Sequence, residues 1–327
     1  MRVTTTIAAA ALLAAGAGKA RAQQINETRS TGPTGTVEIR NTAGSIRVLG
    51  WSRNQVQVTG TLGSGADRVE IEDGGGALVV RVVLSRGSHS GRGTNLEVRV
   101  PARKDVEVQG VSAPVTVEGI DGDVEAQSVS GAVRVAGGRS RAVTASSRSG
   151  AVEVDANAER VEASSVSGSV TVGGSVRDRV EANSVSGGVR ITAVTGEVEA
   201  ASVSGSVEIA SMRGRADVHS VSGSIRVNGR ALSGSFQSVS GTVTLTGDLD
   251  RGADVELASH SGDVTLQLSQ GASADVQAGT FSGDIDVDWP GARVERESRR
   301  SARVRIGGGD ATVKMTTFSG SVKLVRR

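Results

Sequence analysis

Apolar and polar residues alternate along most of this chain, and the alternation turns at a repeated glycine. Apolar residues stand seven and five positions before that glycine and two and four positions after it, as in VEAQSVSGAVRV at 124–135. A period of two is typical of a strand with one buried face. Each repeat is therefore predicted to contain two half-buried strands joined at a bend.

The bend recurs at a nearly fixed spacing. The pivot glycines are 18 to 21 residues apart, apart from a last interval of 37: Gly131, Gly150, Gly168, Gly187, Gly205, Gly223, Gly241, Gly262, Gly283 and Gly320. Such a period indicates a stacked repeat. We predict an all-β fold, a single-stranded parallel β-solenoid (β-helix) of about eleven coils of 18–21 residues. A hexapeptide helix is disfavoured because the columns do not recur every six residues, and a stack of antiparallel hairpins stays open.

Departures from the repeat divide the chain. Residues 23–104 contain strand patterns without a regular period and are expected to form an irregular N-terminal β cap, since an exposed sheet end invites pairing with other chains. The solenoid repeats are expected over 105–288, with Ala113 at the bend of a degenerate first coil. An arginine-rich insert at 289–310 precedes an expected closing coil at 311–327.

The N-terminus has the layout of a secretory signal, expected at residues 1–22. Arg2 precedes the apolar stretch 7–18, and Ala20-Arg21-Ala22 fits a cleavage site before Gln23. Twelve weakly apolar residues are too few to span a bilayer, and no second apolar segment follows. The mature protein is therefore expected to lack a transmembrane segment and to be exported to the periplasm, the cell surface or the extracellular medium.

Composition narrows the functional classes. The chain has no cysteine, which excludes disulfides and a lipid-modified cysteine, and only five aromatic residues, which suits a narrow core of valine, isoleucine, leucine and alanine. Its 37 basic and 35 acidic residues give a net charge of +2. That balance gives no footprint for nucleic acid.

Hydroxyl side chains accompany every bend. A serine or threonine stands three positions before each pivot glycine and a serine stands one position before it. Ten equivalent hydroxyls without a matched base favour ladders that satisfy backbone groups over a nucleophile. The three histidines form no triad or metal site with them. We therefore predict no catalytic residue, no metal site, no cofactor and no enzymatic activity.

The residue two positions before the glycine is ambiguous. Simple alternation points this residue outward, where an apolar stripe would be a candidate contact surface. A bend can instead place two successive residues inside. We favour burial. This valine row comprises Val129, Val166, Val185, Val203, Val221 and Val239. Three positions after the glycine, Arg134 and Glu153 are expected to pair across neighbouring coils, as are Arg190 and Glu208.

Two charged clusters are candidates for a ligand surface. Asp284, Asp286 and Asp288 alternate on one strand, and Asp263 is expected to lie beside Asp284 in the neighbouring coil. Paired carboxylates cleave glycosides in some enzymes, yet the scarcity of aromatics makes catalysis the lesser alternative to weak cation binding or a solvated face. The other cluster lies in the arginine-rich insert and comprises Arg293, Arg296, Arg299 and Arg300. It could bind anionic envelope polymers or lipid head groups, although we favour a solvated hairpin.

Several segments resemble the bacterial putative-adhesin family of exported β-strand-repeat proteins. They are IRNTAGSIRVLGW at 39–51, LEVRVP at 96–101, the SVSG-strand repeats, FSGDIDVDW at 281–289 and TFSGSVKL at 317–324. The resemblance implies a β-helical fold and an adhesin-like role, with no catalytic residues to carry over. The expected function is an adhesin-like binding or scaffold protein of the cell envelope, whose partner is an envelope polysaccharide or another envelope protein. The alternatives are a carbohydrate-active enzyme that uses the aspartates and a purely structural spacer.

Overall fold

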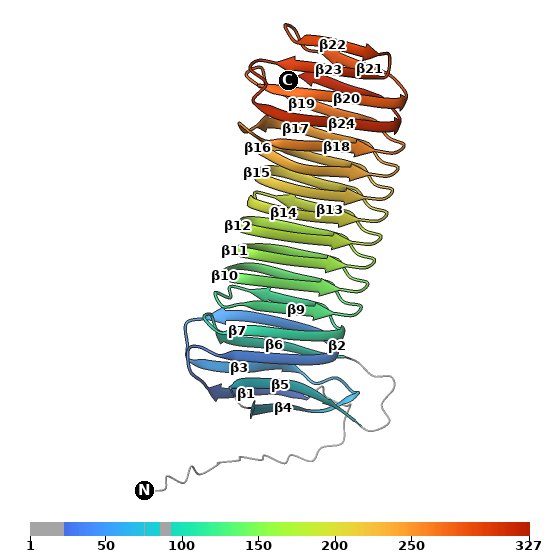
Figure 1. Cartoon of the computed structure of the whole chain (residues 1–327). Helices are drawn as coiled ribbons and strands as arrows, with labels where there is room; N and C mark the ends of the chain where they lie inside the picture. The colour runs from blue at the N-terminus through green and yellow to red at the C-terminus, as the bar shows by residue number, and fades with distance from the viewer. Residues whose placement is uncertain (1–22, 75, 86–92) are drawn as a thin grey trace, which may run out of the picture.

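The computed structural model describes residues 23–327 except 75 and 86–92. Every regular element in that part of the chain is a strand, and the strands form one long, mostly parallel sheet that winds into a stack of coils (Figure 1). The all-β, solenoid-like class predicted above is confirmed. The expected signal peptide lies outside the described residues. No helix long and apolar enough to cross a membrane occurs within them.

The middle of the stack runs from bend to bend as nearly continuous strands. After β9 (Val124–Ser128), each coil starts its strand two residues beyond one pivot glycine and ends it three residues before the next, and two of the coils divide that run into two strands. These strands are β10 (Val133–Ser147), β11 (Val152–Ser165), β12 (Val170–Ser184), β13 (Val189–Thr192) with β14 (Thr195–Ser202), β15 (Val207–Ser220), β16 (Ile225–Ser238), and β17 (Val243–Leu249) with β18 (Asp254–Ser259).

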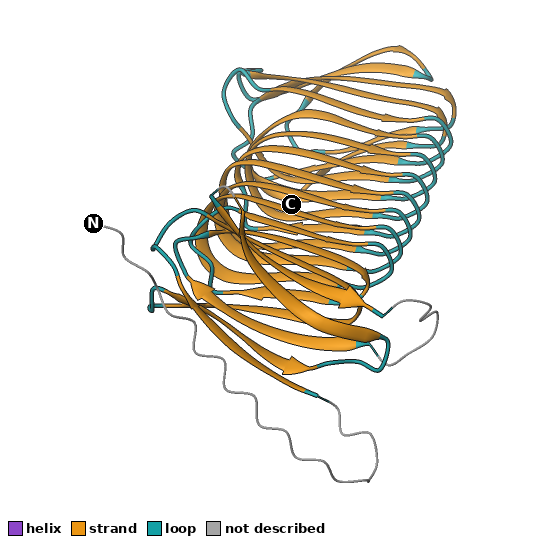
Figure 2. Ribbon diagram, turned by 90° about the horizontal axis from the view of Figure 1, so that it is seen from below, coloured by secondary structure: helices purple, strands orange, loops and turns teal. Residues whose placement is uncertain are grey.

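Successive coils pair in parallel, one repeat apart. Val133 lies beside Val152 and Ser147 beside Ser165, with a register shift only in the return between Ala136 and Arg139. This parallel pairing excludes the stack of antiparallel hairpins. The bends consequently line up along one edge of the stack (Figure 2).

Both ends of the stack place one coil out of sequence order. Near the N-terminus, β2 (Thr36–Trp51) lies between β5 (Ala77–Leu84) and β7 (Asp105–Ser112), and also between β6 (Thr94–Pro101) and β8 (Val115–Glu118). Near the C-terminus, β24 (Ala311–Ser319) lies between β18 and β20 (Ala274–Ser282). In the same coil, β25 (Val322–Arg326) lies between β19 (Val264–Leu268) and β21 (Ile285–Asp288). The expected closing coil therefore lies inside the stack, not at its end.

Antiparallel strands cover the outermost coils. At the N-terminal end, β4 (Ala66–Gly74) pairs with β5, and β1 (Gln24–Ser30) pairs with β3 (Gln55–Thr61), which pairs with β6. At the other end the arginine-rich insert forms a hairpin of β22 (Arg293–Ser298) and β23 (Ser301–Ile306), and β23 pairs with β20. All six residues of β22 are exposed. Charged edge strands of this kind resist pairing with another chain.

The interior is a narrow column of aliphatic side chains. The apolar positions on either side of each bend are buried, as the alternation predicted, among them Val133, Val135 and Val152. Five positions before the pivot glycine the side chain is alanine in the early coils and becomes larger later, with Phe236 fully buried. Few aromatic residues are needed because the two strands of a coil lie close together.

The close approach of neighbouring coils explains why each pivot position requires glycine. A Cβ added at Gly150 would lie 2.2 Å from the carbonyl oxygen of Gly131, and the corresponding distance at the ten pivots is 1.9–2.5 Å. None of the pivots has a positive φ. The requirement for glycine is thus a steric one, imposed by the bend of the adjacent coil.

Candidate functional site

A buried hydroxyl organises each bend. The Oγ of Ser147 donates a hydrogen bond of 2.8 Å to the carbonyl oxygen of Gly131 and accepts one of 2.9 Å from the backbone N–H of Gly150. The residue three positions before the glycine makes the first of these bonds in all ten copies, at 2.8–3.4 Å. The serines one position before the glycine are instead exposed. The hydroxyl ladder is therefore a single column.

The ladder turns the valine row outward. Each valine follows a serine whose side chain fills the inside of the bend, so the alternation continues and the next side chain faces solvent. The exposed fractions are 43–47%, and Val111 of the first coil, at 46%, extends the row. The expectation that the valine row is buried is wrong, because the space inside the bend belongs to the serine.

The same row also contains side chains other than valine. Arg148 interrupts it near the N-terminal end, and His260, Phe318 and Phe281 follow Val239 in that spatial order. The Phe318 ring stacks on His260 with centroids 4.9 Å apart and on Phe281 with centroids 4.6 Å apart. The guanidinium of Arg300 lies 5.6 Å from the centroid of Phe281. The row is thus one exposed side chain per coil, ending in a ladder of rings.

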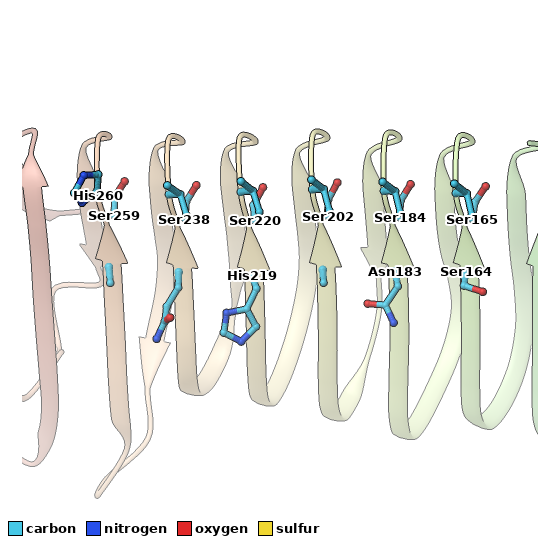
Figure 3. A pocket seen from close by; sticks show the side chains of 18 of the residues that line it. Ser164, Ser165, Asn183, Ser184, Ser202, His219, Ser220, Ser238, Ser259 and His260 are labelled. Carbon is cyan, nitrogen blue, oxygen red and sulfur yellow. The ribbon is translucent and has the colours of Figure 1, made fainter. Parts of the chain in front are cut away.

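A groove runs beside the valines. Its other wall is formed by the side chains four positions before each pivot glycine, and the buried serines lie between the two walls (Figure 3). We call this the valine groove; its volume is about 860 Å³, and its second wall comprises Ser164, Asn183, Ala201, His219, Gln237 and Ala258. A second hollow of about 700 Å³ shares Ser147 and Val166 with it and continues towards Arg40.

The aromatic ladder does not offer a sugar-binding platform. Its rings stack face to face, with interplanar angles of 12° and 5°, so their electron-rich faces cover one another and their edges point outward. The signal was present in the sequence, since His260, Phe281 and Phe318 replace valine in the SHSG and TFSG copies. Those copies keep the serine and glycine of the repeat, so the repeat pattern alone does not single out the three rings.

The aspartate cluster is divided in the structure. The inserted closing coil lies between Asp263 and Asp284, so the predicted neighbourhood of these two carboxylates is wrong. Asp263 accepts a hydrogen bond of 2.9 Å from the Ser321 N–H, and its Oδ2 lies 3.6 Å from Lys323 Nζ. Lys323 also lies beside Asp286. Asp284, Asp286 and Asp288 are exposed, and no group of three or more metal-ligating side chains is found among the described residues.

The candidate arginines do not converge either. Arg293 starts β22 and Arg299 lies in its turn, a separation of about 20 Å along an extended strand. Arg296 donates a hydrogen bond of 3.5 Å to the Ile285 carbonyl oxygen, and Arg300 covers Phe281. Arg296 and Arg300 thus contact the last coil of the stack.

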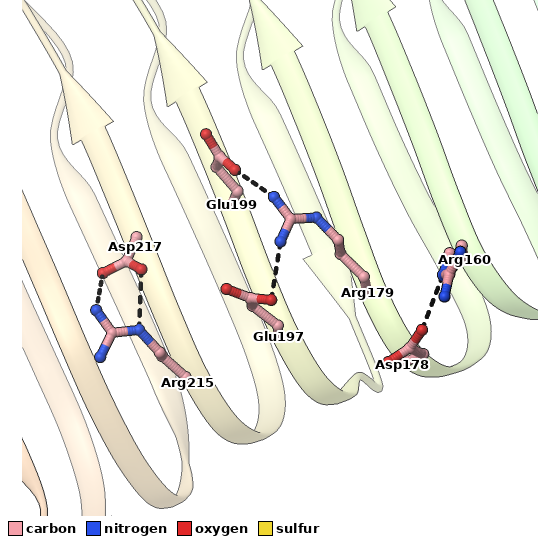
Figure 4. A network of polar contacts seen from close by, with 7 residues as sticks. All are labelled: Arg160, Asp178, Arg179, Glu197, Glu199, Arg215 and Asp217. Carbon is pink, nitrogen blue, oxygen red and sulfur yellow. Dashed lines mark hydrogen bonds and ion pairs between the residues drawn. The ribbon is translucent and has the colours of Figure 1, made fainter.

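Charged ladders run along the outer strands (Figure 4). The predicted pairs Arg134–Glu153 and Arg190–Glu208 are confirmed, the second at 2.9 Å. In the returns, Arg179 bridges Glu197 at 2.8 Å and Glu199 at 2.6 Å. These groups are well exposed, so each pair contributes only a few tenths of a kcal/mol up to about 1.

Lys104 and Asp123 are among the groups in the N-terminal part of the stack whose pKa values are displaced. Burial lowers the pKa of Lys104, whose Nζ donates a hydrogen bond of 2.6 Å to the Thr34 carbonyl oxygen. A hydrogen bond from the Arg141 guanidinium lowers the pKa of the Asp123 carboxyl. Both contacts hold neighbouring coils together and neither side chain lines the valine groove.

Comparison with known proteins gives one family. A family model described as Toastrack DUF4097 matches residues 34–248 and, in a second match, residues 210–325. The chain is also similar to a putative cell adhesion protein from Clostridium sporogenes ATCC 15579, with 9% identity over 93% of this chain and 100% of that one, and a TM-score of 0.22. A putative adhesin from Bacteroides fragilis NCTC 9343 is 11% identical over 93% and 97% of the two chains, with a TM-score of 0.36. No curated protein matches the chain.

Proposed function

The chain belongs to the Toastrack DUF4097 family, and from that premise we propose that it is an exported, non-enzymatic binding or scaffold protein of the bacterial envelope, adhesin-like in its action. The valine groove is its contact surface. One observation carries the proposal: seven valines, each 43–47% exposed, stand in a row on one face of the stack. Arg148 interrupts the row once, and the five valines from Val166 to Val239 follow one another without a break. Soluble proteins rarely expose an apolar strip of that length unless it binds something.

The proposed division of the chain follows from the repeat. Residues 1–22 are a signal peptide, 23–104 an irregular cap and 105–288 the repeats of a solenoid with about eleven coils. The insert 289–310 and the coil 311–327 complete it. Export is tested by mass spectrometry of the protein recovered outside the cytoplasm. We expect its first residue to be Gln23, and a retained Met1 would refute this assignment.

Envelope association is tested by fractionation of the bacterium that produces the protein. The triple variant Val185→Arg, Val203→Arg and Val221→Arg places three charges on the exposed row and none in the core. We expect the parent chain to sediment with envelope fragments and the variant to shift several-fold towards the soluble fraction.

A control variant alters exposed side chains on the after-bend strands and leaves the net charge unchanged. Arg134→Ala with Glu153→Ala removes an exposed ion pair and should leave sedimentation unchanged. Circular dichroism establishes that each variant is folded. If the folded triple variant sediments like the parent chain, the valine groove is not the contact surface.

A further inference from the structure

The valine row and the valine groove lie side by side and run lengthwise along the stack (Figure 3). Each coil adds one exposed side chain and one step of groove, at the strand spacing of about 4.8 Å. From Val111 to Phe281 the row has eleven positions, so it spans about 48 Å. A partner that fills it must match this short repeat over many coils.

The central part of this face carries no charge. Between Val166 and Val239 the two walls are valine on one side and serine, asparagine, alanine, histidine or glutamine on the other. Charge begins in the next outward-facing row, six positions before the glycine, which carries the carboxylates of Glu162, Glu181, Glu199 and Asp217. Arginines pair with Glu199 and Asp217, and the other two carboxylates have no ion-pair partner among the described residues. An apolar, uncharged strip bounded by acids favours a partner that is itself uncharged where it touches.

We propose that the partner of the valine groove is a second copy of this chain, an inference that rests on the proposed function and names the molecule that the groove binds. A second copy has the identical spacing along its whole length, whereas a simple extended peptide strand repeats every two residues, about 6.6 Å. It also presents both complementary features, a row of valines and a groove whose second wall carries no charged side chain, on the same face. Self-complementary patches of this kind are what a twofold interface requires.

Symmetry and charge select one arrangement. A twofold axis parallel to the stack lays the valine row of each copy in the groove of the other, with equal heights opposite and the two stacks running the same way. A twofold axis across the stack would lay each row on itself and would bring Glu162 and Glu181 of one copy, which have no ion-pair partner among the described residues, towards the acidic row of the other. The parallel pair avoids that repulsion, and it places Val203 of each copy against Ala201 of its partner.

The contact area suits a specific dimer. A strip about 48 Å long and roughly 15 Å wide, enough for two rows of side chains, covers on the order of 700 Å² on each copy. Standard specific interfaces bury about 800 Å² on each partner. The rings at one end and Arg148 near the other differ from the valines, and they oppose a slip of the pair by one coil.

Cysteine cross-linking tests the pair directly, because the chain has no cysteine of its own. Single variants Ala201→Cys and Val203→Cys are prepared, mixed and oxidised. We expect a disulfide-linked heterodimer of the two variants. Val203→Cys mixed with Ser164→Cys, which lies on the second wall two coils away from Ala201, should give at least tenfold less product. The matched control Arg226→Cys, on an exposed position of an after-bend strand, should give no dimer with either.

Sedimentation velocity of the unmodified protein separates this inference from the proposed function. The inference is supported if the parent chain is a dimer at micromolar concentration and the cross-linking pattern is as expected. The dimer should be abolished in the triple variant Val185→Arg, Val203→Arg and Val221→Arg. A monomer, or cross-links that ignore coil height, overturns it. If the protein is monomeric and the triple variant still loses envelope association, the inference fails while the binding function stands. If the triple variant changes neither the oligomeric state nor the envelope association, both the inference and the proposed function fail.

Discussion

The serine three positions before each pivot glycine shows how one residue decides the direction of its neighbours. Its hydroxyl, itself buried, donates to a carbonyl oxygen of the adjacent coil and accepts from an N–H of its own bend, both of them partly buried. With that space occupied, Val203 has no place inside although it is apolar. The strongest functional feature of the surface is thus a consequence of how a polar side chain is satisfied.

The variant Ser202→Ala tests that role. It leaves the Gly187 carbonyl oxygen and the Gly205 N–H without the partner they have at 3.0 and 2.9 Å. Loss of a buried hydrogen-bond partner costs about 1–3 kcal/mol, so the midpoint of urea unfolding should fall. Ser204→Ala changes the exposed serine one position before the pivot glycine. It is the control, and its stability should stay within about 0.5 kcal/mol of the parent chain. Equal effects of the two substitutions would contradict the assignment.

At the scale of the strand, the sequence allowed much of the coil to be predicted. Alternation of period two placed Val133, Val135 and Val152 in the core, and the recurring glycine located the bends. The pair Arg190–Glu208 followed from the spacing alone. These features depend on local pattern and on the strand geometry, both of which the sequence carries.

The order of the coils could not be predicted in the same way. Every coil presents nearly the same apolar columns to its neighbours, so β18 can pair with β20 or β24 with little difference in the hydrophobic pattern. Sequence order suggested that Asp263 lies beside Asp284, whereas the structure places Ser321 and Lys323 next to Asp263. The direction of the valine row was uncertain for another reason, since alternation does not say which residue occupies the inside of a bend.

At the scale of the whole molecule, the inserted coil acts as a lock. In a simple solenoid each repeat contacts only the repeats before and after it, so removing the last one leaves the others folded. Here the last 17 residues lie between β18 and β20. They also supply Phe318, which separates His260 from Phe281 in the ring ladder.

Truncation after residue 310 tests this lock. The deleted coil contributes buried Val313, Met315, Val322 and Leu324, each worth about 1.5–3 kcal/mol when fully buried. Its loss also leaves β18 and β20 with unpaired edges. We expect rapid amide hydrogen exchange throughout 274–306 in the truncated protein, while 124–245 stays protected. Deletion of Arg326 and Arg327 alone, at the exposed end of β25, is the control and should leave exchange unchanged. Should β20 simply close onto β18 and keep its protection, the coils are interchangeable, and the inserted order adds no stability of its own.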